Sequence, residues 1–449
     1  MLHVAVVGSG PSGVYTAQSL LQQSQVPDVR VDVLDRLPCP YGLVRYGVAP
    51  DHEKIKSLQN NLRAVLEDER VRFLGGVQVG PDGVPVTRLR DLYHAVVYCV
   101  GAATDRHLGV PGEDLPGSWS ATEFVSWYSA HPDAAAEEFV LGVRSAVVIG
   151  VGNVAVDVTR ILARGAAELS PTDMPQAALA ALAASKVTEI SMVGRRGPSQ
   201  ARFTTKELRE LGSLPDTEIV VHPYELELDP AYLDPSGLPA AQRRNVEVLR
   251  GWADAPAQGR PRRIRPRFFL RPVELLADGG RVGAVRFERT VPDGQGGVTG
   301  TGRFEDIEAQ LVLRSVGYRG VPLDGLPFDA GQGTVPHRAG RILRDDAIAP
   351  GEYVAGWIKR GPTGVIGTNR PCAKETVTSL LEDADTLVRR NVAGDPLAAL
   401  RAEGVRPVEW AGWQAIERAE AELGASLGRG VVKLPDWTSL LTAARTSGS

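Results

Sequence analysis

Cysteine is scarce in this sequence, and the placement of the few cysteines excludes several kinds of redox centre. Cys39, Cys99 and Cys372 are the only three, and they lie far apart without a Cys-x-x-Cys pair or a metal-ligand spacing. We therefore expect no internal iron–sulfur cluster, no zinc or other metal site, and no redox-active disulfide. The three thiols are expected to be buried or spare.

Long apolar runs and a leader sequence are also missing. No apolar run approaches the roughly 18 residues that a membrane-spanning helix needs. A strand-like segment starts at Val4 without a basic, cleavable leader before it. We therefore expect a cytoplasmic protein that does not enter the membrane. Hydrophobic content of 43% and charged content of 23% are ordinary for a globular enzyme, and 449 residues suggest two or three domains.

Glycine, in contrast, is abundant, and it first gathers in a turn between a strand and a helix. The apolar segment 4–7 leads into Gly8-Ser9-Gly10-Pro11-Ser12-Gly13, and a helix-like segment follows at 14–22. In Gly-x-Gly-x-x-Gly the first glycine makes a sharp turn, the second lets a phosphate approach the backbone, and the third packs helix against strand. The start of the helix offers N–H groups and the positive end of its dipole to a pyrophosphate.

A carboxylate follows this turn at the distance expected for a ribose contact. The strand-like segment 31–34 ends in Asp35, about 22 residues after Gly13, close to the offset at which an acidic residue binds the adenosine ribose. A carboxylate suits free ribose hydroxyls, so we expect the first turn to bind FAD.

A second turn lies about 140 residues later and carries a different ribose signal. The segment 146–149 leads into Gly150-Val151-Gly152-Asn153-Val154-Ala155, the Gly-x-Gly-x-x-Ala variant, and a helix-like segment follows at 156–163. The next strand, 189–193, opens into Gly194-Arg195-Arg196-Gly197, with two guanidinium groups where the first site has a carboxylate. Because the planar guanidinium binds phosphate oxygens in pairs, we expect this turn to bind NADP through its 2′-phosphate.

The order of strands and helices predicts two nucleotide domains of the α/β class. Apolar strands and helical stretches alternate through the first hundred residues, which indicates a parallel sheet with helices on both faces. The apolar run 311–318 repeats the pattern of the strand 95–102, and we expect the chain to cross between domains after each. The prediction is two Rossmann-like domains, with an NADP-binding domain at 105–330 inserted into a discontinuous FAD-binding domain at 1–104 and 331–449.

Arginine is concentrated in one segment, which indicates a site for an acidic partner. Nine arginines against Glu247 and Asp254 give residues 243–271 a charge of +7 in a chain of net charge −4. A basic patch speeds the encounter with an acidic protein; a solvated arginine-rich face is the alternative. Nucleic acid is disfavoured because no aromatic stacking platform accompanies the arginines. Docking is expected at Arg243, Arg244 and Arg250, which share a face if this stretch is helical.

Longer motifs resemble the adrenodoxin-reductase-type ferredoxin–NADP reductases, which belong to the wider group of flavoproteins with two dinucleotide domains. The most specific is Leu37-Pro38-Cys39-Pro40-Tyr41-Gly42-Leu43-Val44-Arg45-Tyr46-Gly47-Val48-Ala49-Pro50-Asp51-His52, similar to the family's signature. The segments 150–160, 194–198, 203–211 and 356–368 resemble other family blocks, so the match covers nearly the whole chain. The sequence departs at Asp35, where the family usually has Glu, and at Tyr46; the shorter Asp should still reach a ribose hydroxyl.

The resemblance, together with the glycine turns, implies where the cofactors bind. FAD contacts are expected at Gly8, Gly10, Pro11, Ser12, Gly13, Asp35, Gly42, Leu43, Trp357, Gly364, Val365 and Ile366. NADP contacts are expected at Arg106, Gly150, Gly152, Asn153, Val154, Arg195, Arg196 and Glu207, with Gly364 beside the nicotinamide. The family also places His52 and Glu210 near the site of hydride transfer. Read locally, His52 could equally be a helix-capping histidine, and Glu207 and Glu210 a solvated acidic edge.

These expectations combine into one function. The chain should oxidise NADPH, hold the electrons on FAD and pass them singly to a ferredoxin-type acidic iron–sulfur protein, since no paired cysteines offer an internal relay. The alternatives are a flavin monooxygenase, a glutamate-synthase-type electron-input subunit, which would normally carry extra cysteines for clusters, and a non-catalytic nucleotide-binding protein.

Overall fold

The structure is a computed structural model that describes residues 1–392 and 394–445, and it divides into two compact units. Unit 1 comprises Met1–Thr104, Ser129–Asp133 and Tyr318–Ser449; unit 2 comprises Asp105–Tyr128 and Ala134–Gly317. The chain thus returns to unit 1 at Tyr318, before the boundary at 330 expected from the sequence. The reason lies in packing, because Leu323, Leu326 and Phe328 pack against a core of unit 1.

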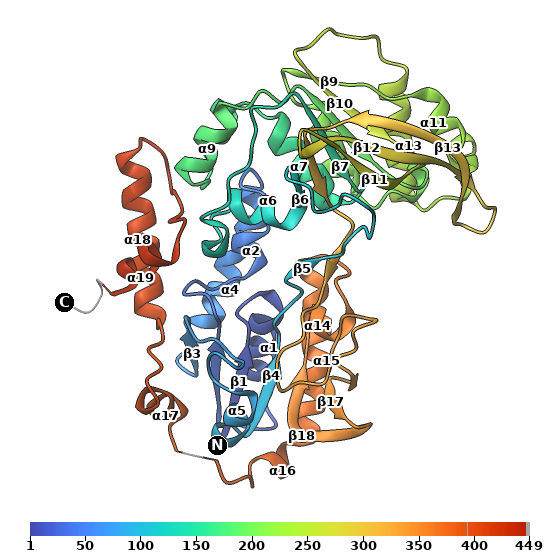
Figure 1. The fold of residues 1–449 in the computed structure, drawn as a ribbon. Coiled ribbons are helices and arrows are strands. Elements are labelled where there is room, and N and C mark those ends of the chain that lie inside the picture. The colour runs from blue at the N-terminus through green and yellow to red at the C-terminus, as the bar shows by residue number, and fades with distance from the viewer. Residues whose placement is uncertain (393, 446–449) are drawn as a thin grey trace. The chain divides into compact units, whose positions relative to one another are not determined.

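Unit 1 is built on a seven-stranded sheet in the order β16-β17-β18-β4-β1-β2-β3 (Figure 1). The five strands from β18 to β3 are parallel, and β16 and β17 continue the sheet in antiparallel pairing. Their bounds are β1 Leu2–Val7, β2 Val29–Leu34, β3 Val71–Leu74, β4 Ala95–Tyr98, β16 His337–Arg338, β17 Arg341–Arg344 and β18 Ala347–Val354. The strands predicted at the N-terminus are therefore confirmed.

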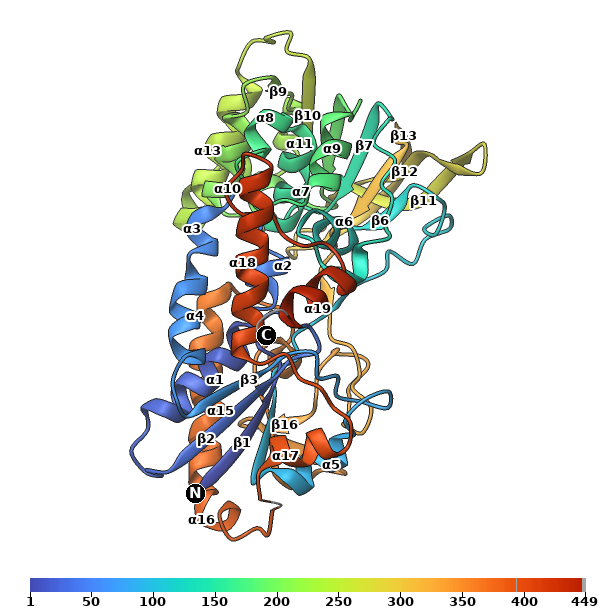
Figure 2. The same ribbon diagram turned by 90° about the vertical axis from the view of Figure 1, so that its left-hand side faces the viewer.

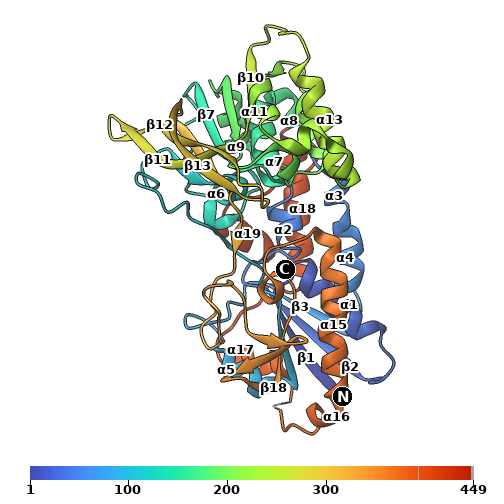
Figure 3. The ribbon, with the colours of Figure 1, turned by 90° about the vertical axis from the view of Figure 1, so that its right-hand side faces the viewer.

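Both faces of this sheet are covered, because its strands point alternate side chains to opposite sides. Val4 and Val6 pack with one group of helices, and Ala5 and Val7 with another. Figures 2 and 3 both show α1 and α15 side by side along the first face. The first group contains α1 Pro11–Gln22, α4 Leu58–Leu66, α15 Asn369–Glu382, α16 Ala384–Leu387, α18 Trp410–Ser426 and α19 Trp437–Arg445; the second contains α5 Val86–Leu92, α14 Trp357–Arg360 and α17 Pro396–Ala402.

Unit 2 contains a six-stranded parallel sheet in the order β6-β14-β7-β8-β10-β9. Its strands are β6 Ser118–Ser120, β7 Ser145–Ile149, β8 Glu189–Val193, β9 Thr217–Ile219, β10 Arg262–Arg267 and β14 Leu311–Arg314. A parallel sheet with crossover helices in each unit confirms the predicted class, two Rossmann-like α/β folds.

The two faces of the unit 2 sheet are covered differently. Helices pack on one face, namely α6 Ala121–Tyr128, α7 Asn153–Ala163, α8 Ala166–Leu169, α9 Gln176–Ala183, α10 Thr205–Gly212, α11 Pro223–Glu227, α12 Pro230–Leu233 and α13 Ala240–Ala253. The other face packs against a three-stranded antiparallel sheet, β11 Leu270–Asp278, β12 Arg281–Pro292 and β13 Val298–Glu308. Figure 3 shows this sheet opposite the helices. The sequence pattern did not predict this antiparallel sheet.

Short elements complete the chain. The crossing segments form a two-stranded sheet of β5 Thr104–Asp105 and β15 Tyr318–Arg319. The signature forms α2 Leu43–Tyr46 and α3 Glu53–Lys56, and the 3₁₀ turns are η1 Pro132–Ala134, η2 Pro198–Gln200, η3 Pro235–Gly237 and η4 Ile366–Thr368. Within residues 1–392 and 394–445, no helix is long and apolar enough to cross a membrane, and no group of His, Cys, Asp or Glu could hold a metal ion.

Candidate dinucleotide-binding sites

The first glycine turn has the close backbone packing that the sequence predicted. Gly8 has a φ of +108°, and a Cβ at Gly13 would lie 1.8 Å from the carbonyl oxygen of Gly8. Helix α1 begins at Pro11 with Gly10 as its N-cap, and no side chain caps it. Gly10 in turn lies against Gly42 of the signature, since a Cβ at Gly42 would come 2.9 Å from the Gly10 Cα. The backbone at this helix start is thus left bare of side chains, as a pyrophosphate requires.

Asp35 lies directly after β2 and is bonded to the glycine turn. Its Oδ2 accepts hydrogen bonds from the Ser9 backbone N (2.8 Å) and Ser9 Oγ (2.5 Å), and its Oδ1 accepts one from Leu37 N (2.9 Å). Burial raises the pKa of the Asp35 carboxyl, and the bonds from Ser9 and Leu37 oppose that rise. A carboxylate has about four acceptor positions, so room for a ribose hydroxyl remains. The anchoring by Ser9 was not foreseen from the sequence.

Among the buried side-chain atoms of unit 1 that have no hydrogen-bond partner in the described residues, two belong to predicted FAD contacts. They are Ser12 Oγ and Trp357 Nε1. A Cβ at Gly356 would lie 2.4 Å from Ser12 Oγ, so only a glycine fits beside it. Since a buried donor without a partner costs about 1–3 kcal/mol, these two atoms fit a bound ligand that carries hydrogen-bond acceptors, as FAD does.

The glycine-rich loop after α14 is held by Arg360, which the sequence did not predict as a site residue. The Arg360 guanidinium donates to the carbonyl oxygens of Gly361 and Thr363, to Thr368 Oγ1 (3.1 Å) and to Asn369 Oδ1 (2.9 Å). Gly364 lies in this loop with a φ of +80°, and the Val365 that follows it is 64% exposed. Ile366 begins η4. The loop therefore presents its backbone at Gly364.

The signature segment is held by the C-terminal part of unit 1. Arg45 is buried and pairs with Glu420 of α18 through contacts of 2.5 and 3.2 Å, and its guanidinium lies over the Trp413 ring. Leu43, the predicted flavin contact, begins α2 and is 37% exposed. No local signal in the sequence indicates Glu420, because 375 positions separate it from Arg45. His52 is buried at the N-cap of α3, without a side-chain cap bond.

The second glycine turn connects β7 to α7. Gly150 has a φ of +143°, and a Cβ there would lie 2.2 Å from the Ser315 carbonyl oxygen. Gly152 is the N-cap of α7, again without a side-chain cap, and Asn153 and Val154 form its first turn. Asn153 Oδ1 accepts a bond from Thr204 N (2.8 Å), so its side chain holds the following segment while its backbone stays at the helix start.

Three arginines lie close to this turn without a carboxylate partner. Arg195 and Arg196 follow β8 as predicted, and the backbone N of Arg202 donates to the Val151 carbonyl oxygen of the turn (2.9 Å). Burial, together with the charges of Arg195 and Arg202, lowers the pKa of Arg196. The three guanidinium groups have no hydrogen bond or ion pair within the part of the chain that the structure describes. This uncompensated charge fits a phosphate dianion. Arg202 was missed because it stands outside the Gly-Arg-Arg-Gly motif.

The two acidic residues of α10 differ in their surroundings. Glu207 is buried, and its Oε2 has no hydrogen-bond partner among the described residues. Glu210 is partly exposed and lies 3.3 Å from the fully buried Arg160 and 3.6 Å from Lys206. The solvated acidic edge that we considered from the sequence therefore does not describe Glu207. Arg106 is exposed, and its backbone N donates to the Gly317 carbonyl oxygen.

Four of the nine arginines in the arginine-rich segment pair with carboxylates. Arg263 pairs with Glu189 and Glu218, Arg265 with Glu189, Arg267 with Glu225 and Glu305, and Arg271 with Glu288, while Arg260 donates to the carbonyl oxygens of Leu214 and Thr217. Arg243 and Arg244 are exposed on α13. Arg250 is half-buried, donates to the Tyr232 carbonyl oxygen and lies 4.9 Å from the Tyr232 ring centre. The exposed charge is therefore much smaller than the +7 counted along the chain.

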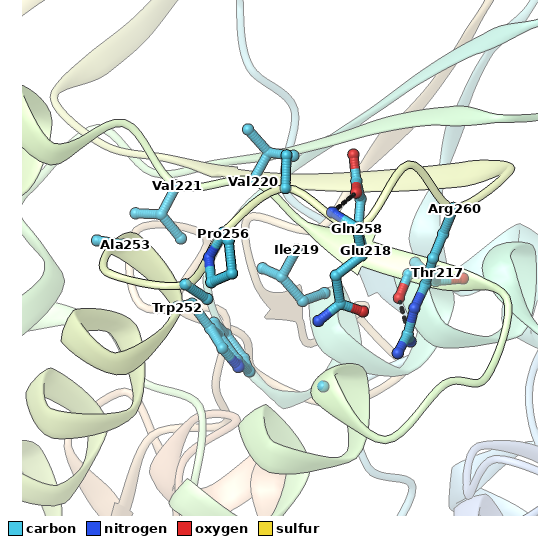
Figure 4. Close-up of a pocket in the computed structure, with 13 residues that line it drawn as sticks. Thr217, Glu218, Ile219, Val220, Val221, Trp252, Ala253, Pro256, Gln258 and Arg260 are labelled. Carbon is cyan, nitrogen blue, oxygen red and sulfur yellow. Dashed lines mark hydrogen bonds between the residues drawn. The ribbon is translucent and has the colours of Figure 1, made fainter.

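A cavity of about 160 Å³ lies elsewhere in unit 2, at the edge strand β9 (Figure 4). Trp252, Ile219 and Pro256 form its apolar wall. The Glu218 carboxylate accepts from Gln258 N, and Arg260 donates to the Thr217 carbonyl oxygen. Because these polar groups satisfy one another, and no predicted site residue lines the cavity, we assign it no part in nucleotide binding.

Comparisons with known proteins agree with two dinucleotide folds. Residues 2–209 match the family described as pyridine nucleotide-disulphide oxidoreductase. This is the class of protein that the fold and the two turns define, although Cys39, Cys99 and Cys372 are free and buried. The chain is 41% identical to the mitochondrial NADPH:adrenodoxin oxidoreductase of Arabidopsis thaliana over 99% of its length and 95% of the relative's. It is 44% identical to NADPH-ferredoxin reductase FprA of Mycobacterium tuberculosis over 98% of both chains.

The solved structure of Mycobacterium tuberculosis FprA in complex with NADPH matches with a TM-score of 0.93, 44% identity and coverage of 99% of each chain. The chain belongs to the adrenodoxin-reductase-type ferredoxin–NADP reductases, as the signature indicated.

Proposed function

We propose that the protein is an NADPH-oxidising flavoenzyme that reduces a ferredoxin-type iron–sulfur protein. The observation that carries this is the chemical difference between the two turns. One is followed by the Asp35 carboxylate, and the other lies beside three arginines for which the described part of the chain offers no carboxylate partner. The first suits the free ribose of FAD, and the second suits the 2′-phosphate of NADP. The names of the relatives, NADPH-ferredoxin reductase and NADPH:adrenodoxin oxidoreductase, support the same reaction.

In unit 1 the residues fit FAD. The start of α1 would hold the pyrophosphate, Asp35 would hold the adenosine ribose, and Ser12 Oγ and Trp357 Nε1 would be donors to acceptor atoms of FAD. When bound, FAD accepts a hydride from NADPH and releases the electrons one at a time. Gly364 lacks a side chain and so allows the nicotinamide to approach closely, while Trp357 contributes a flat aromatic surface.

In unit 2 the residues fit NADP. The start of α7 binds the pyrophosphate through the backbone of Asn153 and Val154, and Arg195, Arg196 and Arg202 bind the 2′-phosphate. Glu207 offers a buried carboxylate oxygen as an acceptor. We propose that His52 and Glu210 orient the nicotinamide and do not act as nucleophiles; Arg160 compensates the charge of Glu210.

An absorption spectrum tests this function directly. The purified protein should be yellow, and anaerobic NADPH should bleach the flavin band, whereas an equal concentration of NADH should act far more slowly. Protein without flavin, or a flavin band that NADPH does not bleach, would contradict the proposal. A flavin monooxygenase would consume oxygen with an organic substrate, and a non-catalytic nucleotide-binding protein would be colourless, so the same preparation separates the alternatives.

The docking surface for the partner is a further part of the proposal. We place it on α13 at Arg243 and Arg244, which are exposed, with Arg250 at its edge. An acidic iron–sulfur protein would be steered there by charge. A cytoplasmic location, expected from the sequence, also remains a prediction; some relatives are named as mitochondrial proteins.

Charge reversal on α13 measures this docking. Arg243→Glu with Arg244→Glu should lower ferredoxin-coupled turnover at low salt on the order of tenfold, because steering acts on the encounter rate, and the loss should shrink at high salt as the charges are screened. Arg250 is left unchanged because it packs on Tyr232. Reduction of ferricyanide by NADPH should stay at the wild-type rate. A parallel loss of both activities would show that α13 has a structural role, and no loss of either would place the partner elsewhere.

A further inference from the structure

Several backbone groups of the turn that carries Arg195 and Arg196 are hydrogen-bonded to β10, to β11 and to the residues between them. Gly194 N donates to the Arg267 carbonyl oxygen of β10 (2.8 Å), and Leu270 N of β11 donates to the Gly194 oxygen (3.1 Å). Phe269 N donates to the Arg196 oxygen (3.3 Å). The backbone of the turn is therefore held by segments that are far from β8 in sequence.

The Arg195 carbonyl oxygen receives its hydrogen bond from a side chain of the antiparallel sheet. Thr290 Oγ1 of β12 donates to it at 2.9 Å, and Thr290 is only 1% exposed. The pairing of β12 with β13 shifts register between Glu288 and Thr290. Such a bulge re-aims a side chain relative to a regular strand, and here it accompanies a threonine hydroxyl directed at the arginine turn.

Backbone strain is found at the same place. Phe269 has a φ of +58°, which is rare for a bulky residue. Its N–H is bonded to the Arg196 oxygen, and its own carbonyl oxygen accepts from Thr290 N (2.8 Å). Phe269 and Thr290 therefore act together on both arginine peptides. Strain of this kind persists where the surrounding structure fixes it, and it often accompanies functional sites.

A second contact ties the tip of the β12–β13 hairpin to the end of the turn. Gln200 Oε1 accepts from Gly197 N (3.4 Å), and Gln200 Nε2 donates to the Gly296 carbonyl oxygen (2.7 Å). A Cβ at Gly197 would lie 2.4 Å from Asp229 Oδ2, so the turn also has little room to shift there. The hairpin thus contacts the turn at two points.

We propose that Thr290 is a positioning residue that sets the selectivity of the protein for NADPH over NADH. Thr290 does not contact the nucleotide. Its hydroxyl holds the Arg195 peptide, and this peptide sets the direction of the guanidinium that binds the 2′-phosphate. The antiparallel sheet, which no nucleotide motif includes, thereby becomes part of the specificity site. This rests on the proposed function, because it requires that Arg195 and Arg196 bind the 2′-phosphate.

The test replaces the hydroxyl with a methyl group of the same shape. Thr290→Val keeps the β-branched side chain that a strand favours but removes the donor. We expect the Kd for 2′,5′-ADP and the KM for NADPH to rise roughly 2- to 10-fold, the range for one neutral hydrogen bond. The Kd for 5′-ADP, the KM for NADH and kcat should not change. Thr290→Ser, which keeps the hydroxyl, should restore the wild-type ratio of the two affinities.

The matched control is Thr301→Val, since Thr301 Oγ1 of the neighbouring strand β13 donates to the Arg289 carbonyl oxygen (2.8 Å) at an exposed position. It should leave the ratio unchanged. Equal losses for 2′,5′-ADP and 5′-ADP in Thr290→Val, or no loss for either, would overturn the proposal. A double Arg195→Ala, Arg196→Ala variant identifies which idea fails: if it too leaves the ratio unchanged, the proposed function of the arginines is wrong, and if only Thr290→Val does, the positioning role alone is wrong.

Discussion

Alanine at both Arg195 and Arg196 is expected to weaken NADPH binding by about 2 to 4 kcal/mol, a loss of roughly 30- to 700-fold in affinity. Hydrogen bonds to charged groups contribute more than neutral ones, and among the described residues no carboxylate pairs with these two arginines. Because Arg195 is exposed, solvent screens its interaction with the phosphate, and this lowers the upper limit of the expected loss in binding free energy. NADH kinetics should hardly change. Stopped-flow measurement of flavin reduction at varied nucleotide concentration gives both numbers.

A control with the same change of net charge is available on the antiparallel sheet. Arg281 and Arg303 are exposed in β12 and β13, and neither side chain has an ion pair within the described residues. Their double alanine variant should bind NADPH as the wild type does. Equal losses for NADPH and NADH in the Arg195, Arg196 variant would indicate that these arginines hold the fold or the pyrophosphate instead.

Asp35→Ala is expected to release FAD. Loss of a charge-assisted bond to the ribose should cost on the order of 1.5 to 3 kcal/mol of binding free energy. The structure adds a second contribution, because the same carboxylate accepts from Ser9 N, Ser9 Oγ and Leu37 N, and those donors would lose their partner. The purified variant should lose its yellow colour on dilution, measured as the ratio of flavin to protein absorbance, while its preference for NADPH over NADH stays unchanged.

Two further variants separate the contributions to the loss of FAD. Ser9→Ala removes only the hydroxyl donor and should lose less FAD than Asp35→Ala does. Asp35→Glu keeps the carboxylate on a side chain that is longer by one methylene, and it should retain FAD. Thermal unfolding in excess FAD checks that Asp35→Ala still folds. If that variant kept its flavin and lost its selectivity for NADPH, the assignment of the two turns would be reversed.

The glycine turns could be predicted from the sequence because their geometry depends on neighbouring residues. Gly8 and Gly150 need positive φ angles, and Gly13 has no room for a side chain. Each condition restricts the residue type at a fixed spacing, so the motif can be recognised in the sequence without knowledge of the fold. The strands and helices around the turns follow for the same reason, since their apolar patterns are local.

The arginine-rich segment shows where a prediction from neighbouring residues in the sequence is wrong. Counting charge along residues 243–271 predicted a strongly basic face, but Glu189, Glu218 and Glu225 come from other parts of unit 2 and pair with its arginines. A charge count includes only neighbours in sequence, whereas ion pairs form between neighbours in space. The apolar run 311–318 indicated the return of the chain at Tyr318, whereas the domain boundary at 330 lay too far along the chain, because Leu323, Leu326 and Phe328 already pack against a unit 1 core.

The sequence by itself determined the two nucleotide turns, their different ribose signals, the α/β class and the family. Only the tertiary structure decided that Arg202 joins Arg195 and Arg196, that Ser9 anchors Asp35, and that Thr290 holds the arginine turn. The physical reason is how far apart in the sequence the interacting residues lie. A tight turn and a helix start are imposed by the dihedral angles and side-chain volumes of a few consecutive residues. A hydrogen bond across 95 positions, such as that from Thr290 to Arg195, exists only once the sheets have packed.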